Sequence, residues 1–136
     1  MSLFGITKGT VLEEQVEQSL KAETQGAVMY CALSRIAAEQ GLTDIAAMLG
    51  KVAEDELRHA GLYMVLNGHA PEKLVNVLDQ FGKLESAAEA KIDAFAQQAR
   101  ALGLHLAAAE IEAVAKDEAR HGKILEALLE TLNSHA

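Results

Sequence analysis

Apolar residues recur every three or four positions along most of this 136-residue chain, which is the period of an amphipathic α-helix. Glycines interrupt the pattern at positions 41, 68 and 103, where helices commonly end. Pro71 is expected at the first position of the third helix. The predicted helices cover about residues 10–40, 43–67, 71–102 and 105–132. The pattern therefore predicts an all-α protein of four helices.

The apolar positions of the first three predicted helices form one stripe each, and each stripe is expected to face a common core. The stripes run through Val16, Leu20, Ala27, Tyr30, Leu33 and Ala37, then Ile45, Leu49, Val52, Leu62 and Leu66, then Leu74, Leu78, Phe81 and Ala88. Cys31 is expected to be a buried, unreactive thiol.

A short polar segment occurs twice, at residues 55–59 and 117–121, and both copies contain Glu-x-x-His. On a helix this spacing places a carboxylate and an imidazole on one face. The same offset of 62 positions also aligns Lys21 with Lys83, Glu23 with Glu85, Gly41 with Gly103, Leu42 with Leu104, and several alanines. We interpret residues 1–136 as one domain built from two repeated helical hairpins, about 10–68 and 71–133.

The spacing of these residues around each turn predicts which side chains lie at the same height. Glu23 precedes Gly41 by 18 residues, and His59 follows it by 18. Both arms of the hairpin are therefore about 27 Å long, at about 1.5 Å per residue. Glu85 and His121 flank Gly103 with the same spacing. Each hairpin thus brings two carboxylates and one imidazole together.

Four glutamates and two histidines converging in a helical bundle form the ligand arrangement of ferritin-like dinuclear metal sites. The predicted ligands are Glu23, Glu56, His59, Glu85, Glu118 and His121. Four carboxylates balance two divalent cations, whereas without metal they would repel one another. This donor set favours iron or manganese over zinc. A purely structural bundle without metal would leave the aligned acids unexplained.

Composition excludes several other classes. The net charge is −8 and no basic cluster is present, which argues against nucleic-acid binding. The single cysteine rules out an internal disulfide and a four-cysteine metal centre. No apolar run approaches the length of a membrane span, and no signal peptide is apparent at the N-terminus. We expect a cytoplasmic protein.

The chain resembles the rubrerythrin family of the ferritin-like superfamily, in the short form that lacks a rubredoxin segment. The resemblance is carried by residues 21–24, 56–60, 84–85 and 117–121. It implies a di-iron peroxidase that reduces hydrogen peroxide to water in oxidative-stress defence. Electrons would come from an external donor such as rubredoxin or a reductase. The resemblance also implies that Glu56 and Glu118 bridge the two ions, and that Tyr30 lies beside the site; Tyr30 is equally consistent with a core aromatic residue.

Two departures from the family pattern keep an alternative function open. Rubrerythrins usually carry a further glutamate where this chain has Ala88, and Glu89 points about 100° away from that position. The fourth-helix motif of the family typically ends in Glu-His, whereas His121 occupies the glutamate position here. The resulting four-Glu, two-His set resembles that of bacterioferritin. The alternative is an iron-oxidising, iron-binding protein that uses oxygen or peroxide.

The connection between the two hairpins predicts a dimer. In ferritin-like bundles the second and third helices are parallel, so their connection must return along the bundle. Only residues 68–71 interrupt the helical pattern, and four residues span at most about 14 Å. Our hypothesis is a domain-swapped homodimer in which each chain completes the other's site. Unwinding of residues 72–84 into a crossover is the alternative.

Overall fold

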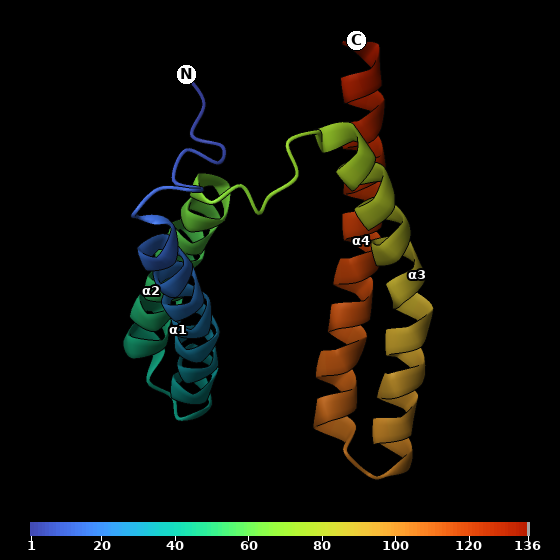
Figure 1. Ribbon diagram of the computed structural model, residues 1–136. Helices are drawn as coiled ribbons and strands as arrows, with labels where there is room; N and C mark the ends of the chain where they lie inside the picture. Colours follow the sequence, from blue (N-terminus) through green and yellow to red (C-terminus); the bar gives the residue numbers. More distant parts are fainter. Residues whose placement is uncertain (136) are drawn as a thin grey trace. The chain divides into compact units, whose positions relative to one another are not determined.

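The computed structural model describes residues 1–135, which form four α-helices and no strand. The helices are α1 (Glu13–Glu39), α2 (Thr43–Leu66), α3 (Leu74–Ala101) and α4 (His105–Ser134). Within these described residues α1 pairs with α2 and α3 pairs with α4, each pair as an antiparallel hairpin (Figure 1). The predicted all-α class and the two helical hairpins are confirmed. Ala136, the last residue of the predicted domain, lies outside the described part.

The two hairpin turns are built in the same way, as the duplication predicts. Gly41 and Gly103 adopt φ of 75° and 79°, a left-handed conformation that suits glycine. In the first turn the amide of Leu42 donates to the carbonyl of Ala37 at 2.9 Å, and Leu104 makes the matching bond at 3.0 Å. These bonds satisfy the carbonyls at the helix ends and stop both helices at equivalent positions. The register of the two arms therefore agrees between the hairpins.

The start of the third helix differs from the prediction. Pro71 does not begin the helix, because α3 starts three residues later at Leu74. Proline is compatible with the first turn of a helix but does not require one. Residues 67–73 therefore connect α2 to α3, a longer connection than expected. Residues 74–84 are helical, so their proposed unwinding into a crossover is wrong.

Small residues fill the contact between the paired helices. The buried positions are Val16, Ala27, Ala37, Ala46, Ala53 and Ala60 in the first hairpin, and Ala96, Ala99, Ala108, Ala115 and Gly122 in the second. Alanine and glycine allow two helices to approach closely, which holds the polar side chains of one helix within reach of those on the other. The close approach is therefore what brings the candidate ligands together.

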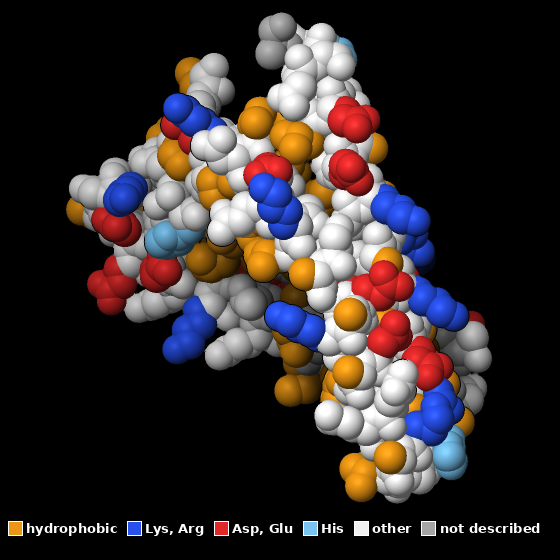
Figure 2. Space-filling view, turned by 90° about the vertical axis from the view of Figure 1, so that its right-hand side faces the viewer, with side chains coloured by type: hydrophobic (Ala, Val, Ile, Leu, Met, Phe, Trp, Pro, Cys, Tyr) orange, Lys and Arg blue, Asp and Glu red, His pale blue; other side chains and the backbone are white. Residues whose placement is uncertain are grey.

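Several larger apolar residues of the predicted stripes are exposed on the hairpins, whereas others, such as Leu49 and Leu78, are half-buried. Leu33, Ile45 and Phe81 are examples of the exposed ones. Figure 2 shows apolar side chains at the surface among acidic and basic ones. A helix in a hairpin has one partner, which covers only part of its apolar stripe. Exposed apolar faces of this kind are consistent with hairpins that form a four-helix bundle.

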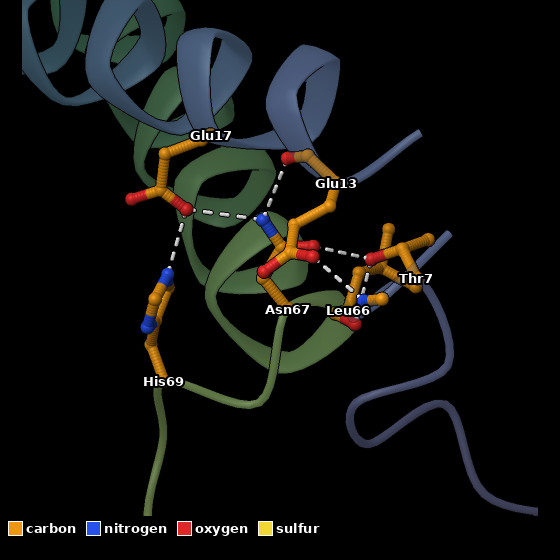
Figure 3. A network of polar contacts seen from close by, with 7 residues as sticks. Thr7, Glu13, Glu17, Leu66, Asn67 and His69 are labelled. Carbon is orange, nitrogen blue, oxygen red and sulfur yellow. Dashed lines mark hydrogen bonds and ion pairs between the residues drawn. The ribbon is translucent and has the colours of Figure 1, made fainter. Parts of the chain in front are cut away.

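A polar cluster ties the N-terminal segment to both helices of the first hairpin (Figure 3). Asn67, only 2% exposed, donates to the Glu13 carbonyl and to Glu17 Oε2, both at 3.0 Å. Thr7 Oγ1 lies 2.5 Å from Asn67 Oδ1. His69 is exposed, and its Nε2 lies 2.7 Å from Glu17 Oε2. The cluster fixes where the chain leaves α2.

None of the helices in residues 1–135 is both long enough and apolar enough to cross a membrane. Their apolar residues are instead interspersed with charged ones, as in helices that pack against other helices.

Candidate metal centre

The first hairpin brings Glu23 of α1 together with Glu56 and His59 of α2. One potential ligand atom from each residue lies within 4.8 Å of the others. His59 Nδ1 is 3.4 Å from Glu23 Oε2, so the imidazole reaches across the hairpin. Glu56 and His59 share a helix face because they are three residues apart, and the glycine turn places Glu23 at their height. The predicted grouping of these three residues is present.

The second hairpin repeats the arrangement with Glu85 of α3 and with Glu118 and His121 of α4, again within 4.8 Å. Here His121 Nδ1 lies 3.4 Å from Glu118 Oε2 on its own helix and 3.9 Å from Glu85 Oε2. The imidazole therefore pairs more closely within its helix than across the hairpin. The two groups contain the same residues in slightly different geometries.

The paired carboxyl groups perturb one another's protonation. A hydrogen bond shared with Glu23, reinforced by partial desolvation, raises the pKa of Glu56. In the second hairpin the hydrogen bond between Glu85 and Glu118 raises the pKa of Glu85 and lowers the pKa of Glu118. One carboxyl group of each pair therefore retains its proton more readily than an ordinary glutamate, as expected when two acids share a site.

The candidate ligands lie on an open face of each hairpin. The side chains of Glu23, Glu85 and Glu118 are 23–27% exposed, and those of His59 and His121 are 53% and 46% exposed. Each hairpin thus offers three donor atoms from one side only. A metal ion bound there would leave coordination positions for further ligands.

Other residues considered from the sequence are placed as follows. Tyr30 is half-buried on α1, one heptad after Glu23. Glu89 is exposed and lies outside the ligand group. Cys31 is exposed rather than buried, because the position after Tyr30 faces about 100° away around the helix. Arg58 pairs with Asp55, and Arg120 makes the equivalent pair with Asp117.

Two glycines at the level of the ligands were missed by the sequence analysis. A Cβ added to Gly26 would lie 2.9 Å from Glu56 Oε2, so the carboxylate occupies the space of the missing side chain. A Cβ added to Gly122 would lie 2.4 Å from Ser86 Oγ and 3.1 Å from Ser86 N. Both glycines lie inside helices with ordinary backbone angles. A glycine within a helix at ligand height was the signal that could have found them.

The donor set fits divalent iron or manganese. Each group supplies carboxylate oxygen and imidazole nitrogen, ligands that suit these ions. Two neighbouring carboxyl groups resist being ionised at the same time because their charges repel. A bound cation removes this repulsion by taking the place of the shared proton. The space beside Gly26 accommodates a carboxylate at ligand height. These residues could therefore hold metal without a change of fold.

Two hairpins that each present Glu, Glu and His from one helix pair place the chain among ferritin-like helical proteins. The chain belongs to the rubrerythrin family. The Rubrerythrin family model matches residues 14–83, which include Glu23, Glu56 and His59 and end two residues before Glu85. The second ligand group is therefore assigned through the internal repeat.

A relative in Methanocaldococcus jannaschii, an uncharacterised protein, is 33% identical over 127 residues. The aligned region covers 93% of this chain and 90% of the relative. The likeness thus extends over both hairpins. No solved structure matches the chain significantly.

Proposed function

We propose that this protein is a di-iron peroxidase that reduces hydrogen peroxide to water with electrons from an external donor. Family membership and the two Glu–Glu–His groups, each within 4.8 Å, are the observations that support it. A pair of bound ferrous ions would supply two electrons, so that hydrogen peroxide and two protons give two water molecules. Rubredoxin or a reductase is the proposed donor.

The residues of the chain would bind the two metal ions and hold them in position. In the proposed site Glu23, Glu56, Glu85 and Glu118 act as carboxylate ligands and balance the charge of two divalent cations. His59 and His121 would each be the terminal ligand of one metal ion. The acids with raised pKa would release their protons on metal binding, so metal affinity would fall in acid.

Stopped-flow absorbance of the anaerobically reduced, iron-loaded protein tests this function. We expect rapid oxidation by hydrogen peroxide and slower oxidation in air-saturated buffer. Variant E118A/H121A is the matched loss-of-ligand control, and its absorbance change should be lost. Failure of the wild-type protein to bind two metal ions per site would refute the proposal.

An iron-oxidising, iron-binding function is the second candidate. The feature that favours it is Ala88, which stands where a further carboxylate occurs in rubrerythrins and leaves the four-Glu, two-His set. Oxidation by oxygen as fast as by peroxide, without repeated turnover when a reduced donor is added, would favour this candidate over the peroxidase. Manganese or a mixed metal pair in the purified protein would weigh against both iron functions.

We also propose that the protein is a homodimer whose chains exchange hairpins. Each hairpin supplies three of the six proposed ligands. Hydrogen bonds from the amides of Gly68 and His69 to Val65 and Met64 close the end of α2, so the connection becomes free to extend only beyond His69. These bonds limit how far apart the two hairpins of one chain can be.

The reach of the connection supports exchange. Leu66 lies ten residues after Glu56 and Leu74 eleven before Glu85, so parallel α2 and α3 would place these helix ends about 31 Å apart along the bundle. The five steps from His69 to Leu74 span at most about 18 Å. A site with α2 parallel to α3, as in ferritin-like bundles, would therefore need a second chain.

A further inference from the structure

Gly26 lies on α1 one turn after Glu23, on the helix face that carries this ligand. A Cβ at Gly26 would lie 2.9 Å from Glu56 Oε2 and 3.2 Å from Glu56 Cδ, closer than ordinary contact. The backbone of Gly26 is not left-handed, so no turn requires glycine here. Glycine in the middle of a helix lowers its stability. What distinguishes the position is the space that the missing side chain leaves for the Glu56 carboxylate.

The internal repeat supplies a natural comparison. The residue that corresponds to Gly26 in the second hairpin is Ala88, which has the Cβ that Gly26 lacks. The ligand geometry also differs between the hairpins. His59 pairs across the hairpin with Glu23 at 3.4 Å, whereas the imidazole of the second hairpin pairs more closely within its own helix. The hairpin that has glycine at this position thus differs from the hairpin that has alanine in how its histidine pairs with the glutamates.

We infer that Gly26 is a positioning residue: its bare Cα lets the Glu56 carboxylate lie against α1, within reach of Glu23 and His59, and makes the two metal positions inequivalent. The inference rests on the proposed metal-binding function and deepens it. It assigns the first hairpin a ligand geometry that the second hairpin does not share.

The effect of filling this space follows from the contacts. The atoms closest to a Cβ at position 26 belong to the end of the Glu56 side chain, which is flexible, and not to backbone. The carboxylate would therefore move by about half an ångström or more while the helices stay in place. Ligands must be held within about 0.5 Å of their productive positions. A methyl group at position 26 should thus disturb metal binding without disturbing the fold.

The test is titration of the full-length, metal-free protein with Co²⁺, followed by visible absorbance, in the wild type and in the variant G26A. We expect the wild type to bind two ions per site. In G26A the affinity for one of the two ions should fall about 10–100-fold, the range for residues that orient ligands. The absorption bands of that ion should change as its ligand geometry changes.

Thermal unfolding of the metal-free proteins separates positioning from a structural role. Alanine forms helix better than glycine, so G26A should unfold at the same temperature as the wild type or a higher one. The matched control A88G should do the opposite, with a lower unfolding temperature and Co²⁺ affinity within about threefold of the wild type.

Each outcome is decisive. Weaker Co²⁺ binding by G26A at unchanged or raised stability supports the inference. Wild-type Co²⁺ affinity in G26A, or a loss of affinity in step with a loss of helix stability, overturns it. Absence of Co²⁺ binding by the wild-type protein would instead show that the proposed function has failed.

Discussion

Gly122 of α4 lies directly against Ser86 of α3, one residue away from the candidate ligands His121 and Glu85 on the two helices. A Cβ at Gly122 would lie 2.4 Å from Ser86 Oγ, 3.1 Å from Ser86 N and 3.3 Å from Ser86 Cα. Two of these atoms belong to the backbone, so a side-chain rotation cannot relieve the crowding. A close contact between α3 and α4 therefore lies beside the ligand group of the second hairpin.

G122A should consequently destabilise the second hairpin. Overpacking of this kind costs about 1–3 kcal/mol, which exceeds the roughly 1 kcal/mol gained in helix propensity on replacing glycine by alanine. Urea unfolding followed by circular dichroism measures the difference. Gly61 provides the control, because nothing lies within 4 Å of a Cβ added there, so G61A should be stabilising. Equal stabilisation by both substitutions would show that the helices are not held this closely.

Glu56 leads to a prediction for the metal-free protein. Because its pKa is raised in the folded state, chiefly by the hydrogen bond with Glu23, the contribution of Glu56 to stability is fully present in acid. It is lost as the pH rises through the raised pKa. The amide of E56Q resembles the protonated acid, so metal-free E56Q should unfold at a higher temperature than the wild type at neutral pH.

Addition of metal should reverse the order of the unfolding temperatures of E56Q and the wild type. Mn²⁺ or Co²⁺ should raise the unfolding temperature of the wild type at neutral pH and have little effect on E56Q. E54Q, at an exposed position on the same helix, is the control and should respond to metal like the wild type. Thermal unfolding with and without metal at two pH values gives the answer. An equal response to metal in E56Q would remove Glu56 from the ligand set.

The close grouping of the Glu and His side chains within each hairpin could be predicted because the turns fix the register of the two helices. Once Gly41 ends α1, equal spacing on both sides leaves Glu23 beside His59 whatever the rotamers are. The role of Gly26 could not be predicted in this way, because it depends on where the flexible Glu56 side chain lies. The start of α3 was misplaced because Pro71 permits a helix start without requiring it.

Burial was predicted less well than register. The apolar period shows that Leu33 and Ile45 lie on a helix stripe, but it does not show which part of the stripe the paired helix covers. Alanines fill the contact within each hairpin, and the larger residues lie beyond it. Cys31 was expected to be buried but is exposed, because a helical period does not by itself show which side of the helix its partner covers.

Glu17 in the polar cluster of the first hairpin should make stability depend on pH in the opposite sense to Glu56. Hydrogen bonds from His69 and Asn67 lower the pKa of Glu17. Its contribution is therefore complete above the ordinary glutamate pKa and is lost as the pH falls through the lowered value. The wild type should be more stable than E17Q at neutral pH, and the difference should vanish in strong acid.

Urea unfolding of both proteins across the acidic range tests this dependence. Variant E14Q serves as the control, because Glu14 accepts a hydrogen bond from Gln18 at 3.3 Å on its own helix and should show no comparable change. A difference between wild type and E17Q that stays constant down to strong acid would mean that the carboxylate charge does not stabilise the cluster.

Exchange of hairpins between two chains leads to the sharpest prediction about assembly. Variant E56A/H59A has a damaged first ligand group, and E118A/H121A has a damaged second one. Neither variant alone contains a complete set of six ligands. If each site joins the first hairpin of one chain to the second hairpin of the other, a mixed dimer has one site with all six ligands and one site damaged twice.

The two variants should therefore regain metal binding when they are denatured together and refolded. Random pairing would restore about a quarter of the wild-type number of complete sites, because half of the dimers are mixed and each holds one intact site. Co²⁺ absorbance measures the recovery, with each variant refolded alone as the control. Absence of recovery, in variants that refold with wild-type helix content, would mean that each site is built within a single chain. That result would reject the exchange and leave the proposed metal site in place, since the six ligands would then meet through an antiparallel arrangement of α2 and α3.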